Sequence, residues 1–475
     1  MRTAIVAFVL ACLVSVLLTP LVRRVALSRH LFDDHRDARK VHGRPIPRLG
    51  GVAIAAGFYA PLLGLLIQGS VVGSMFYAVG WKAVGFMAGG VAICLLGLYD
   101  DLRGAGAGKK FAVQFAIAAA LYFLGFRIQV LSLPFAGAVS LGVLALPFTM
   151  LWIVGVINAM NLIDGLDGLA AGVALSAVLT TFIISALRGD PLMMLYMAAL
   201  GGATLGFLVY NFNPASIFMG DTGSMFLGYV LGVGAIQASQ KSSTAVAIIV
   251  PLLALGLPIA DTLLAMIRRL LAGRPMFSAD RGHIHHRLLD AGLSQKQAVL
   301  ILYAASALFG GAALFVTFAS GLQAAIVLVA LVTIAFIAMR QLGYGHLRAA
   351  VDPAAASSLP RFESLARVAD EAQLWRELRS AAHLLRLSAI RVSVHGQEDG
   401  EPTSLVWSHG VVPGESWATH ELTTSTRSGS VLVEYRPDGP LEAKSLTAFE
   451  ASLSTCLNAL YGAELDSAAH HIGRA

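Results

Sequence analysis

From the N-terminus to about residue 340 the chain alternates long apolar runs with short polar connections. Each run has about twenty mostly apolar residues, the length that crosses the hydrocarbon core of a bilayer as a helix. The pattern predicts an all-α polytopic membrane bundle of about eleven transmembrane helices. We expect them at Ala4–Val22 and near residues 50–68, 82–99, 111–126, 140–160, 168–187, 191–210, 224–238, 243–266, 297–318 and 322–339.

The ninth run contains two prolines, Pro251 and Pro258. Proline lacks the amide hydrogen that continues a helix, and its ring clashes with the preceding turn. We therefore expect a kink or a break in this run.

The pattern changes after residue 340. Residues 341–360 are rich in small residues, which indicates a linker. We expect residues 361–465 to form a small α+β domain and residues 466–475 to form a tail. Within the domain we expect a helix at 361–387, strands at 389–394, 404–408, 419–424 and 430–435, and a final helix at 441–461. This order resembles a GAF-like fold. It carries no catalytic constellation, so a regulatory or interaction role and a purely stabilising one both stay open.

The composition agrees with a membrane protein. Of 475 residues, 56% are apolar and only 13% charged, and the mean hydropathy is +0.72, whereas about a quarter of the residues of a soluble domain are charged. The net charge of +6 does not indicate nucleic-acid binding, because the basic residues gather in a few loops between spans. The three cysteines lie far apart in the chain and form no disulfide framework.

The placement of the basic residues predicts the topology. Lysine and arginine concentrate between the first and second spans, after the third, and between the ninth and tenth, whereas the other loops hold only isolated cations. By the positive-inside rule the dense loops are cytoplasmic. The N-terminus is then expected outside, and the C-terminus and the small domain inside.

The chemistry-bearing residues all fall at the predicted cytoplasmic ends of spans. Asp100 and Asp101 end the third span, Asn158–Gly168 ends the fifth, Asn213 and Asp221 follow the seventh, and Asp261 with the loop 268–286 ends the ninth. An ion-coupled transporter is expected to place its ionisable groups near the bilayer midplane. The pattern therefore favours chemistry at the inner face.

Converging carboxylates need a cation among them. Asp100, Asp101, Asp164, Asp167 and Asp221 offer only oxygen ligands, which select Mg²⁺ or Mn²⁺. Opposite them stand cationic groups that suit phosphate oxygens: Lys109, Lys110, Arg274, Arg281 and the histidines His283, His285 and His286. Carboxylates, a divalent metal and cationic donors together are typical of sites that catalyse phosphoryl transfer.

These segments resemble the signature motifs of the polyprenyl-phosphate N-acetylhexosamine-1-phosphate transferases (glycosyltransferase family 4). The similar stretches are Leu98–Asp101, Asn158–Gly168, Asn211–Ser224, Pro258–Asp261 and Phe277–His286, and in the early loop Arg39–His42 and Pro45–Gly51. They occur in order over about residues 1–340. The soluble domain lies outside the resemblance.

The resemblance implies a role for each matching residue. Asp221 matches the metal-binding aspartate and Phe218 a uracil-stacking position, while Asp100 and Asp101 match the paired aspartates that organise the acceptor phosphate. Asp164 and Asp167 are implied as organisers of nucleotide and metal, with Asp164 also a candidate ligand. The expected substrate-binding set is completed by Asn161, Asn213, Lys109, Lys110, Arg281, His283, His285, His286, Lys40, His42 and Arg48.

The implied reaction moves a sugar 1-phosphate from a UDP-sugar to polyprenyl (undecaprenyl) phosphate. It would occur at the cytoplasmic face of a bacterial inner membrane, release UMP and initiate a cell-envelope polysaccharide. The loop 279–286 is similar to that of the branch using UDP-N-acetylhexosamines and favours UDP-N-acetylglucosamine. The acceptor phosphate is already mostly a dianion at neutral pH, so direct attack and an aspartyl-phosphate route stay open. A homodimer is compatible with the sequence. The alternative function is a non-catalytic transporter or lipid-binding protein.

Overall fold

The computed structural model describes residues 1–29, 46–67, 74, 79–133, 137–240, 249–271 and 282–341, and in the C-terminal part 373–374, 377–378, 387–396, 403–408, 420–426 and 429–437. The chain divides into two compact units, of which the first comprises residues 1–34 and 42–347. Lys40, His42, Arg274 and Arg281 lie outside the described residues.

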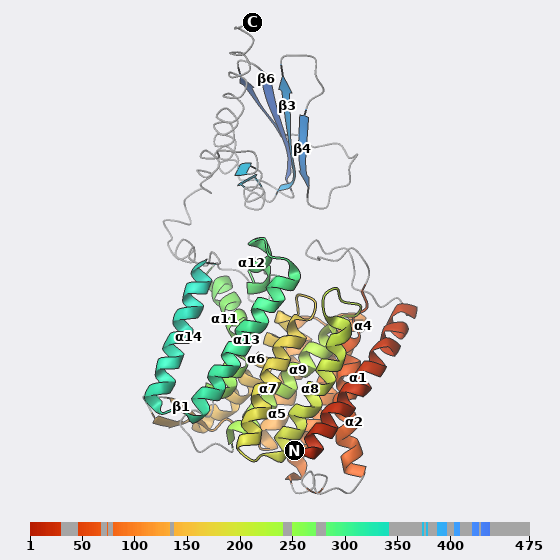
Figure 1. Ribbon diagram of the computed structural model, residues 1–475, viewed down its shortest axis with the longest axis vertical. Helices are drawn as coiled ribbons and strands as arrows, with labels where there is room; N and C mark the ends of the chain where they lie inside the picture. The colour runs from red at the N-terminus through yellow and green to blue at the C-terminus, as the bar shows by residue number, and fades with distance from the viewer. Residues whose placement is uncertain are drawn as a thin grey trace. The chain divides into compact units, whose positions relative to one another are not determined.

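The first unit is a bundle of helices (Figure 1). In chain order they are α1 (Arg2–Ser28), α2 (Gly50–Ile67), α4 (Trp81–Arg103), α5 (Ala107–Phe123), α6 (Ala145–Ile163), α7 (Leu169–Leu187), α8 (Pro191–Asn211), α9 (Gly220–Gln240), α10 (Ile249–Ala254), α11 (Gly256–Leu271), α12 (Ile284–Asp290), α13 (Gln295–Phe318) and α14 (Gly321–Gln341).

Eight of the described helices are long and apolar enough to cross a membrane: α1, α2, α4, α6 with the turn before it, α7, α8, α13 and α14. The other three predicted spans coincide with α5, α9 and the α10–α11 pair. A polytopic bundle is thus in agreement with the structure, and the count of eleven stays a prediction.

The ninth apolar run is broken, as its prolines predicted. α10 ends at Ala254 and α11 begins at Gly256, with Leu255 in a turn between them. Pro251 and Pro258 each stand at the third position of their helix, where the missing amide would have no partner within that helix.

The structure adds a β-hairpin to a region for which we expected only a loop and the start of a span. Strand β1 (Val130–Leu133) pairs antiparallel with β2 (Gly137–Ser140), and Val130 lies opposite Ser140. Four residues of alternation are too short a pattern to distinguish from an irregular loop. The first unit is therefore almost, but not entirely, helical.

Helix α8 forms the centre of the bundle. It is mostly buried and packs against α1, α2 and α7. Its contact with α1 depends on Gly202, because a Cβ there would lie 2.9 Å from the carbonyl carbon of Phe8. Glycine at such a position allows two helix backbones to approach closely within a membrane.

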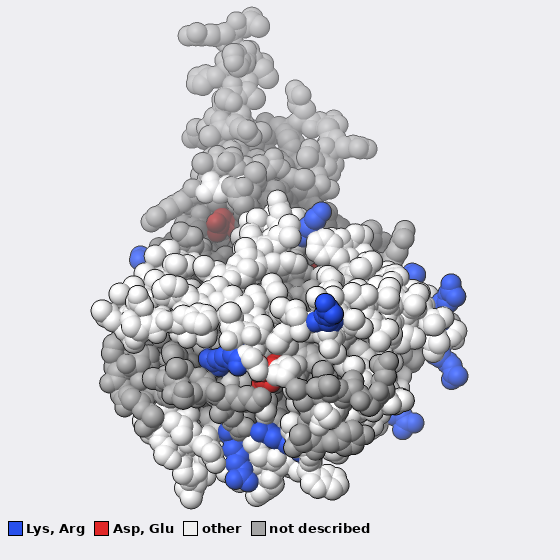
Figure 2. Space-filling model, turned by 60° about the horizontal axis from the view of Figure 1, so that its bottom comes forward, with Lys and Arg blue, Asp and Glu red and all other residues white. Residues whose placement is uncertain are grey.

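The two ends of the bundle differ. Figure 1 places α12 at the end opposite the marked N-terminus, and β1 near the N-terminal end. Figure 2 turns that N-terminal end toward the viewer and shows a mostly uncharged surface with scattered Lys and Arg. The carboxylates at the ends of α4 and α6 and at the start of α9 lie at the other end.

The second unit contains a four-stranded antiparallel sheet. Its strands are β3 (Leu387–Gly396), β4 (Thr403–Ser408), β5 (His420–Thr426) and β6 (Gly429–Pro437), in the order β4-β3-β6-β5. They overlap the four strand ranges expected from the sequence. The predicted helices at 361–387 and 441–461 lie largely outside the described residues, and the likeness to a GAF-like fold stays a prediction.

Candidate active site

Three glycines bring the site's helices into contact. A Cβ on Gly97 of α4 would lie 2.5 Å from the Cα of Thr222 in α9, and one on Gly51 of α2 would lie 2.6 Å from the carbonyl carbon of Thr222. Gly220 at the start of α9 is equally confined by Asp101. Backbone therefore meets backbone at this junction, which places the end of α4 directly beside the start of α9.

Asp101 holds that junction together. Its carboxylate accepts hydrogen bonds from the amides of Asp221 (2.8 Å) and Thr222 (3.0 Å) and from the Thr222 hydroxyl (2.6 Å). The first amides of a helix have no partner inside it, and a carboxylate there also suits the helix dipole. Asp101, a residue of α4, thus caps the N-terminus of α9.

Its neighbour Asp100 belongs to a different contact. One oxygen of Asp100 accepts a hydrogen bond from the Ala105 amide in the α4–α5 turn, and the other lies 2.9 Å from the Lys110 ammonium. The same ammonium lies 2.8 Å from Asp221. Lys110 therefore joins one carboxylate of α4 to one of α9, and all three side chains keep partial access to solvent. We expected both Lys109 and Lys110 to bind substrate, but Lys109 is exposed.

The connection between α6 and α7 supplies the remaining carboxylates. Asp164 follows the last residue of α6, and Asp167 is buried, with one oxygen accepting from the Asn213 side chain and the Ala215 amide, both at 3.0 Å. Asn161 donates to Ser224 of α9 at 2.9 Å. Asp167, Asn161 and Asn213 thus tie this connection to the segment around α9.

Asp164 is surrounded by other carboxylates. Its removal from water, together with the carboxylates of Asp221 and Asp101, raises its pKa to about 8, against the opposing effect of Arg48. A buried carboxyl among other carboxylates binds a proton or a cation more readily than an isolated one. Asp164 therefore holds a proton near pH 7 when no cation is bound beside it.

The segment before α2 is paired with the segment before α9. The Phe218 amide donates to the Pro47 carbonyl at 2.8 Å, and the Gly50 amide donates to the Phe218 carbonyl at 2.9 Å. This pairing places Phe218 and Arg48, which are distant in sequence, beside the carboxylates.

The histidine segment is held by a buried carboxylate of α11. Asp261 accepts from the His283 ring nitrogen Nδ1 and from the Ile284 amide, each at 2.8 Å. The His283 ring stacks on His285 with 5.7 Å between centroids, and His286 lies 4.3 Å from His285. His285 covers Gly165, since a Cβ at that glycine would collide with its ring. The histidines thus reach the connection that carries Asp164 and Asp167.

Burial changes what His285 can do. Desolvation, aided by the neighbouring His286, lowers the pKa of His285 to about 3, so its ring is neutral near pH 7. Its Nδ1 has no hydrogen-bond partner among the described residues. We had expected a cationic group for phosphate, but a neutral ring suits a hydroxyl or amide of a ligand instead.

Several contributors were not identified from the sequence. The Tyr303 hydroxyl of α13 donates to the Gly168 carbonyl at 2.6 Å, and Gln295 accepts from Asn213 at 2.9 Å. Neither residue lies near a recognisable motif. Thr222 was not identified either, although it lies inside the motif around Asp221, a position that could have indicated it.

The arrangement fits a magnesium ion. Magnesium is commonly bound by one or two carboxylates with water and substrate phosphates, not by an all-protein cage. Asp100 and Asp221 already converge on one cationic group, whereas no three carboxylate, thiol or imidazole side chains within the described ranges enclose an ion by themselves. Asp221 and Asp100, with Asp164 nearby, are the residues that would hold it.

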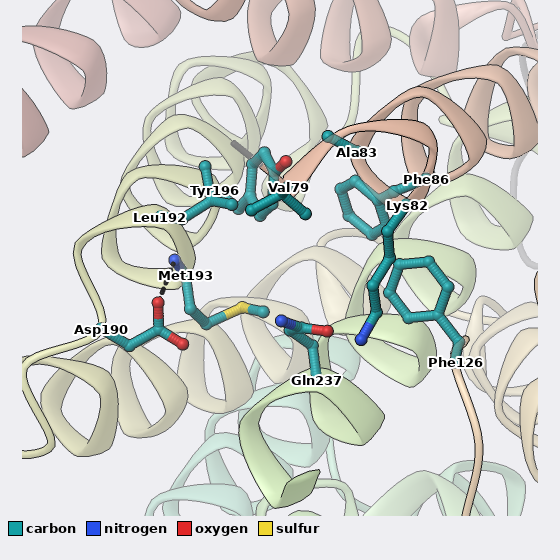
Figure 3. Close-up of a pocket in the computed structure, with 10 residues that line it drawn as sticks. All are labelled: Val79, Lys82, Ala83, Phe86, Phe126, Asp190, Leu192, Met193, Tyr196 and Gln237. Atoms are coloured by element: carbon teal, nitrogen blue, oxygen red, sulfur yellow. Dashed lines mark hydrogen bonds between the residues drawn. The ribbon is translucent and has the colours of Figure 1, made fainter. Parts of the chain in front are cut away.

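A cavity between α4, α8 and α9 lies at the opposite ends of these helices (Figure 3). It has about 20 Å³ of free space, enough for one water molecule. Two of its polar residues have structural contacts: Asp190 accepts from the Met193 amide at the start of α8, and the Lys82 ammonium lies 4.9 Å from the centre of the Phe126 ring. It is separate from the carboxylate site.

Comparison with known proteins places the chain in a family. The sequence profile of glycosyl transferase family 4 matches residues 83–239. A probable undecaprenyl-phosphate N-acetylglucosaminyl 1-phosphate transferase of Bacillus subtilis is 41% identical over 301 residues, which cover 63% of this chain and 81% of that protein. The chain belongs to glycosyl transferase family 4.

Two other relatives differ in how similar they are to this chain. A decaprenyl-phosphate N-acetylglucosaminephosphotransferase of Mycolicibacterium smegmatis is 40% identical over 287 residues, 56% of this chain and 70% of that protein. A phospho-N-acetylmuramoyl-pentapeptide-transferase of Clostridioides difficile is 30% identical over 311 residues, 63% of this chain and 92% of that protein. The matching region of this chain is thus more similar to the two N-acetylglucosamine-named relatives.

Proposed function

We propose that this protein transfers N-acetylglucosamine 1-phosphate from UDP-N-acetylglucosamine to a polyprenyl phosphate and releases UMP. The observation that carries the proposal is the meeting of Asp100, Lys110 and Asp221 from three helices at one end of an apolar bundle. There a lipid acceptor arrives from the bilayer and a nucleotide from water. The names of the relatives supply the sugar and the lipid class.

In the proposed reaction an oxygen of the acceptor phosphate attacks the β-phosphorus of the UDP-sugar. The bond from that phosphorus to the bridging oxygen breaks, and UMP leaves with the electron pair. A magnesium ion, when bound, neutralises phosphate charge. Lys110 donates to phosphate oxygens, Arg48 adds a second positive charge near the carboxylates, and neutral His285 binds an uncharged group of the donor. A route through an aspartyl phosphate is the alternative for the same overall transfer.

We further propose that the site faces the cytoplasm of a bacterial inner membrane. The support is the concentration of Lys and Arg in the loops at the same end of the spans. Cysteines introduced singly at Lys109 and at Val143, which are exposed at opposite ends of the bundle, test this in intact cells. A membrane-impermeant maleimide is expected to label Val143→Cys and not Lys109→Cys.

Activity is tested with purified protein, polyprenyl phosphate, labelled UDP-N-acetylglucosamine and Mg²⁺. We expect a labelled lipid product and an equal amount of UMP, and loss of both in a folded Asp221→Asn variant. Other UDP-sugars assayed in parallel define the donor. No product with Mg²⁺ or Mn²⁺ would favour the alternative, a non-catalytic transporter or lipid-binding protein on the same scaffold.

A further inference from the structure

The Lys110 ammonium occupies the position where the two carboxylates meet. It lies 2.9 Å from Asp100 and 2.8 Å from Asp221, at hydrogen-bonding distance from one oxygen of each. Lys110 comes from the first turn of α5, whereas the carboxylates come from α4 and α9. A single ammonium therefore contacts carboxylates from two different helices.

The same two oxygens are the ligands that the site offers to a divalent ion. An oxygen that coordinates Mg²⁺ at about 2.0–2.1 Å and also holds an ammonium brings two positive charges within a few ångströms of each other. At that separation like charges repel strongly, and the more so in a partly buried site. The two cations therefore compete for the same position.

The surroundings allow the ammonium to leave. The side chains of Lys110, Asp100 and Asp221 are 23%, 15% and 25% exposed, so the cluster opens to solvent. Lysine has a flexible four-carbon stem and three donors on a compact charge. It can move from the carboxylates to a nearby phosphate, which offers several acceptor oxygens.

We propose that Lys110 is a displaceable counterion, which holds Asp100 and Asp221 together until a divalent cation takes its place and its ammonium passes to a substrate phosphate. This inference rests on the proposed function for the identity of the phosphate ligand, and on the structure for the competition itself. In the absence of substrate, Lys110 therefore weakens the binding of a divalent cation, although Lys110 is needed for turnover.

The test measures Mn²⁺ binding to the full-length protein without substrate, by titration calorimetry or by the loss of the free-ion electron paramagnetic resonance signal. Lys110→Met keeps the length of the side chain and removes its charge. We expect it to bind Mn²⁺ at least tenfold more tightly than the wild type, and to lose most of its transferase activity. Lys110→Arg, which keeps the charge, is expected to leave Mn²⁺ affinity within about threefold of the wild type.

Lys109→Met is the matched control, because Lys109 is adjacent in sequence and exposed. It is expected to change Mn²⁺ affinity by less than about twofold, since an exposed charge is screened by water and salt. Unchanged or weaker binding by folded Lys110→Met would overturn the proposal, as would equal tightening by Lys109→Met. Because binding is measured without substrate, a wild type that binds Mn²⁺ but makes no product counts against the proposed function and not against the competition.

Discussion

At the scale of single residues, neighbouring side chains of the same type have different tasks. Asp100 faces the Lys110 ammonium, whereas Asp101 accepts three hydrogen bonds from the start of α9. Asp164 stands among carboxylates, whereas Asp167 binds the segment at 213–215. Each pair thus combines one residue that faces the chemistry with one that holds the backbone in place.

The raised pKa of Asp164 predicts a pH-dependent stability. Because its folded pKa of about 8 is above its ordinary value, the folded state keeps a proton that the unfolded state loses between about pH 4 and pH 8. The free energy of unfolding therefore falls as the pH rises through this window. In metal-free Asp164→Asn this loss is absent, and we expect the variant to melt a few degrees above the wild type at pH 8.

The measurement is a series of thermal melts in detergent with a chelator, from pH 5 to pH 9. Asp290→Asn, at an exposed carboxylate of α12, is the control and should follow the wild type throughout. Parallel pH profiles for Asp164→Asn and the wild type would show that Asp164 is ionised in the folded protein.

At the scale of elements, the site depends on how closely α2, α4 and α9 approach. The contacts at Gly51, Gly97 and Gly220 leave no room for a side chain. Protein interiors are close-packed, so a methyl group added at such a contact strains the side chains or displaces the backbone. Asp100 comes from α4 and Asp221 from α9, so a shift between these helices changes the distance between the two carboxylates directly.

Gly97→Ala is therefore expected to lower the free energy of unfolding by about 1–3 kcal/mol. Since a displacement of about 1 Å in an active site costs on the order of a hundredfold in rate, we expect turnover to fall by more than tenfold. Thermal melting and the transfer assay report the two effects.

Gly155→Ala provides the control for this experiment. Gly155 lies in α6, and a Cβ at that position meets no atom within 4 Å. Alanine in place of a helical glycine is expected to be neutral or to stabilise by about 0.5–1 kcal/mol. If Gly97→Ala retained both stability and turnover, the α4–α9 contact would be looser than the structure shows.

At the scale of the whole molecule, the membrane unit and the sheet-containing unit are distinct. The matching profile and the carboxylate cluster both fall within the first unit. Strands β3–β6 form an antiparallel sheet of their own. The transfer reaction is therefore expected to require only the first unit.

Truncation after Gln341, the last residue of α14, tests this expectation. The shortened protein should retain most of the wild-type turnover per folded molecule, measured after size-exclusion chromatography. A monodisperse truncated protein without activity would show that the second unit contributes to the reaction.

The sequence by itself determined the helices and the end of the bundle that carries the chemistry. An apolar run of about twenty residues predicts a membrane span whatever its neighbours are, because the free energy of its transfer into lipid depends on its own residues. Carboxylates and amides at the ends of runs must meet water or a polar ligand. The candidate site was therefore predictable as a set of residues, including Asp100, Asp164 and Asp221, whereas Phe218 was named only because of the family resemblance.

Only the tertiary structure decided the roles within that set. Lys109 and Lys110 are equivalent in the sequence, but successive residues of a helix point about 100° apart, and only Lys110 reaches the carboxylates. The neutral state of His285 depends on its burial against Gly165, and the contacts of Tyr303 and Gln295 join segments more than eighty residues apart. Burial and long-range hydrogen bonds are properties of packed helices, so no local pattern contains them.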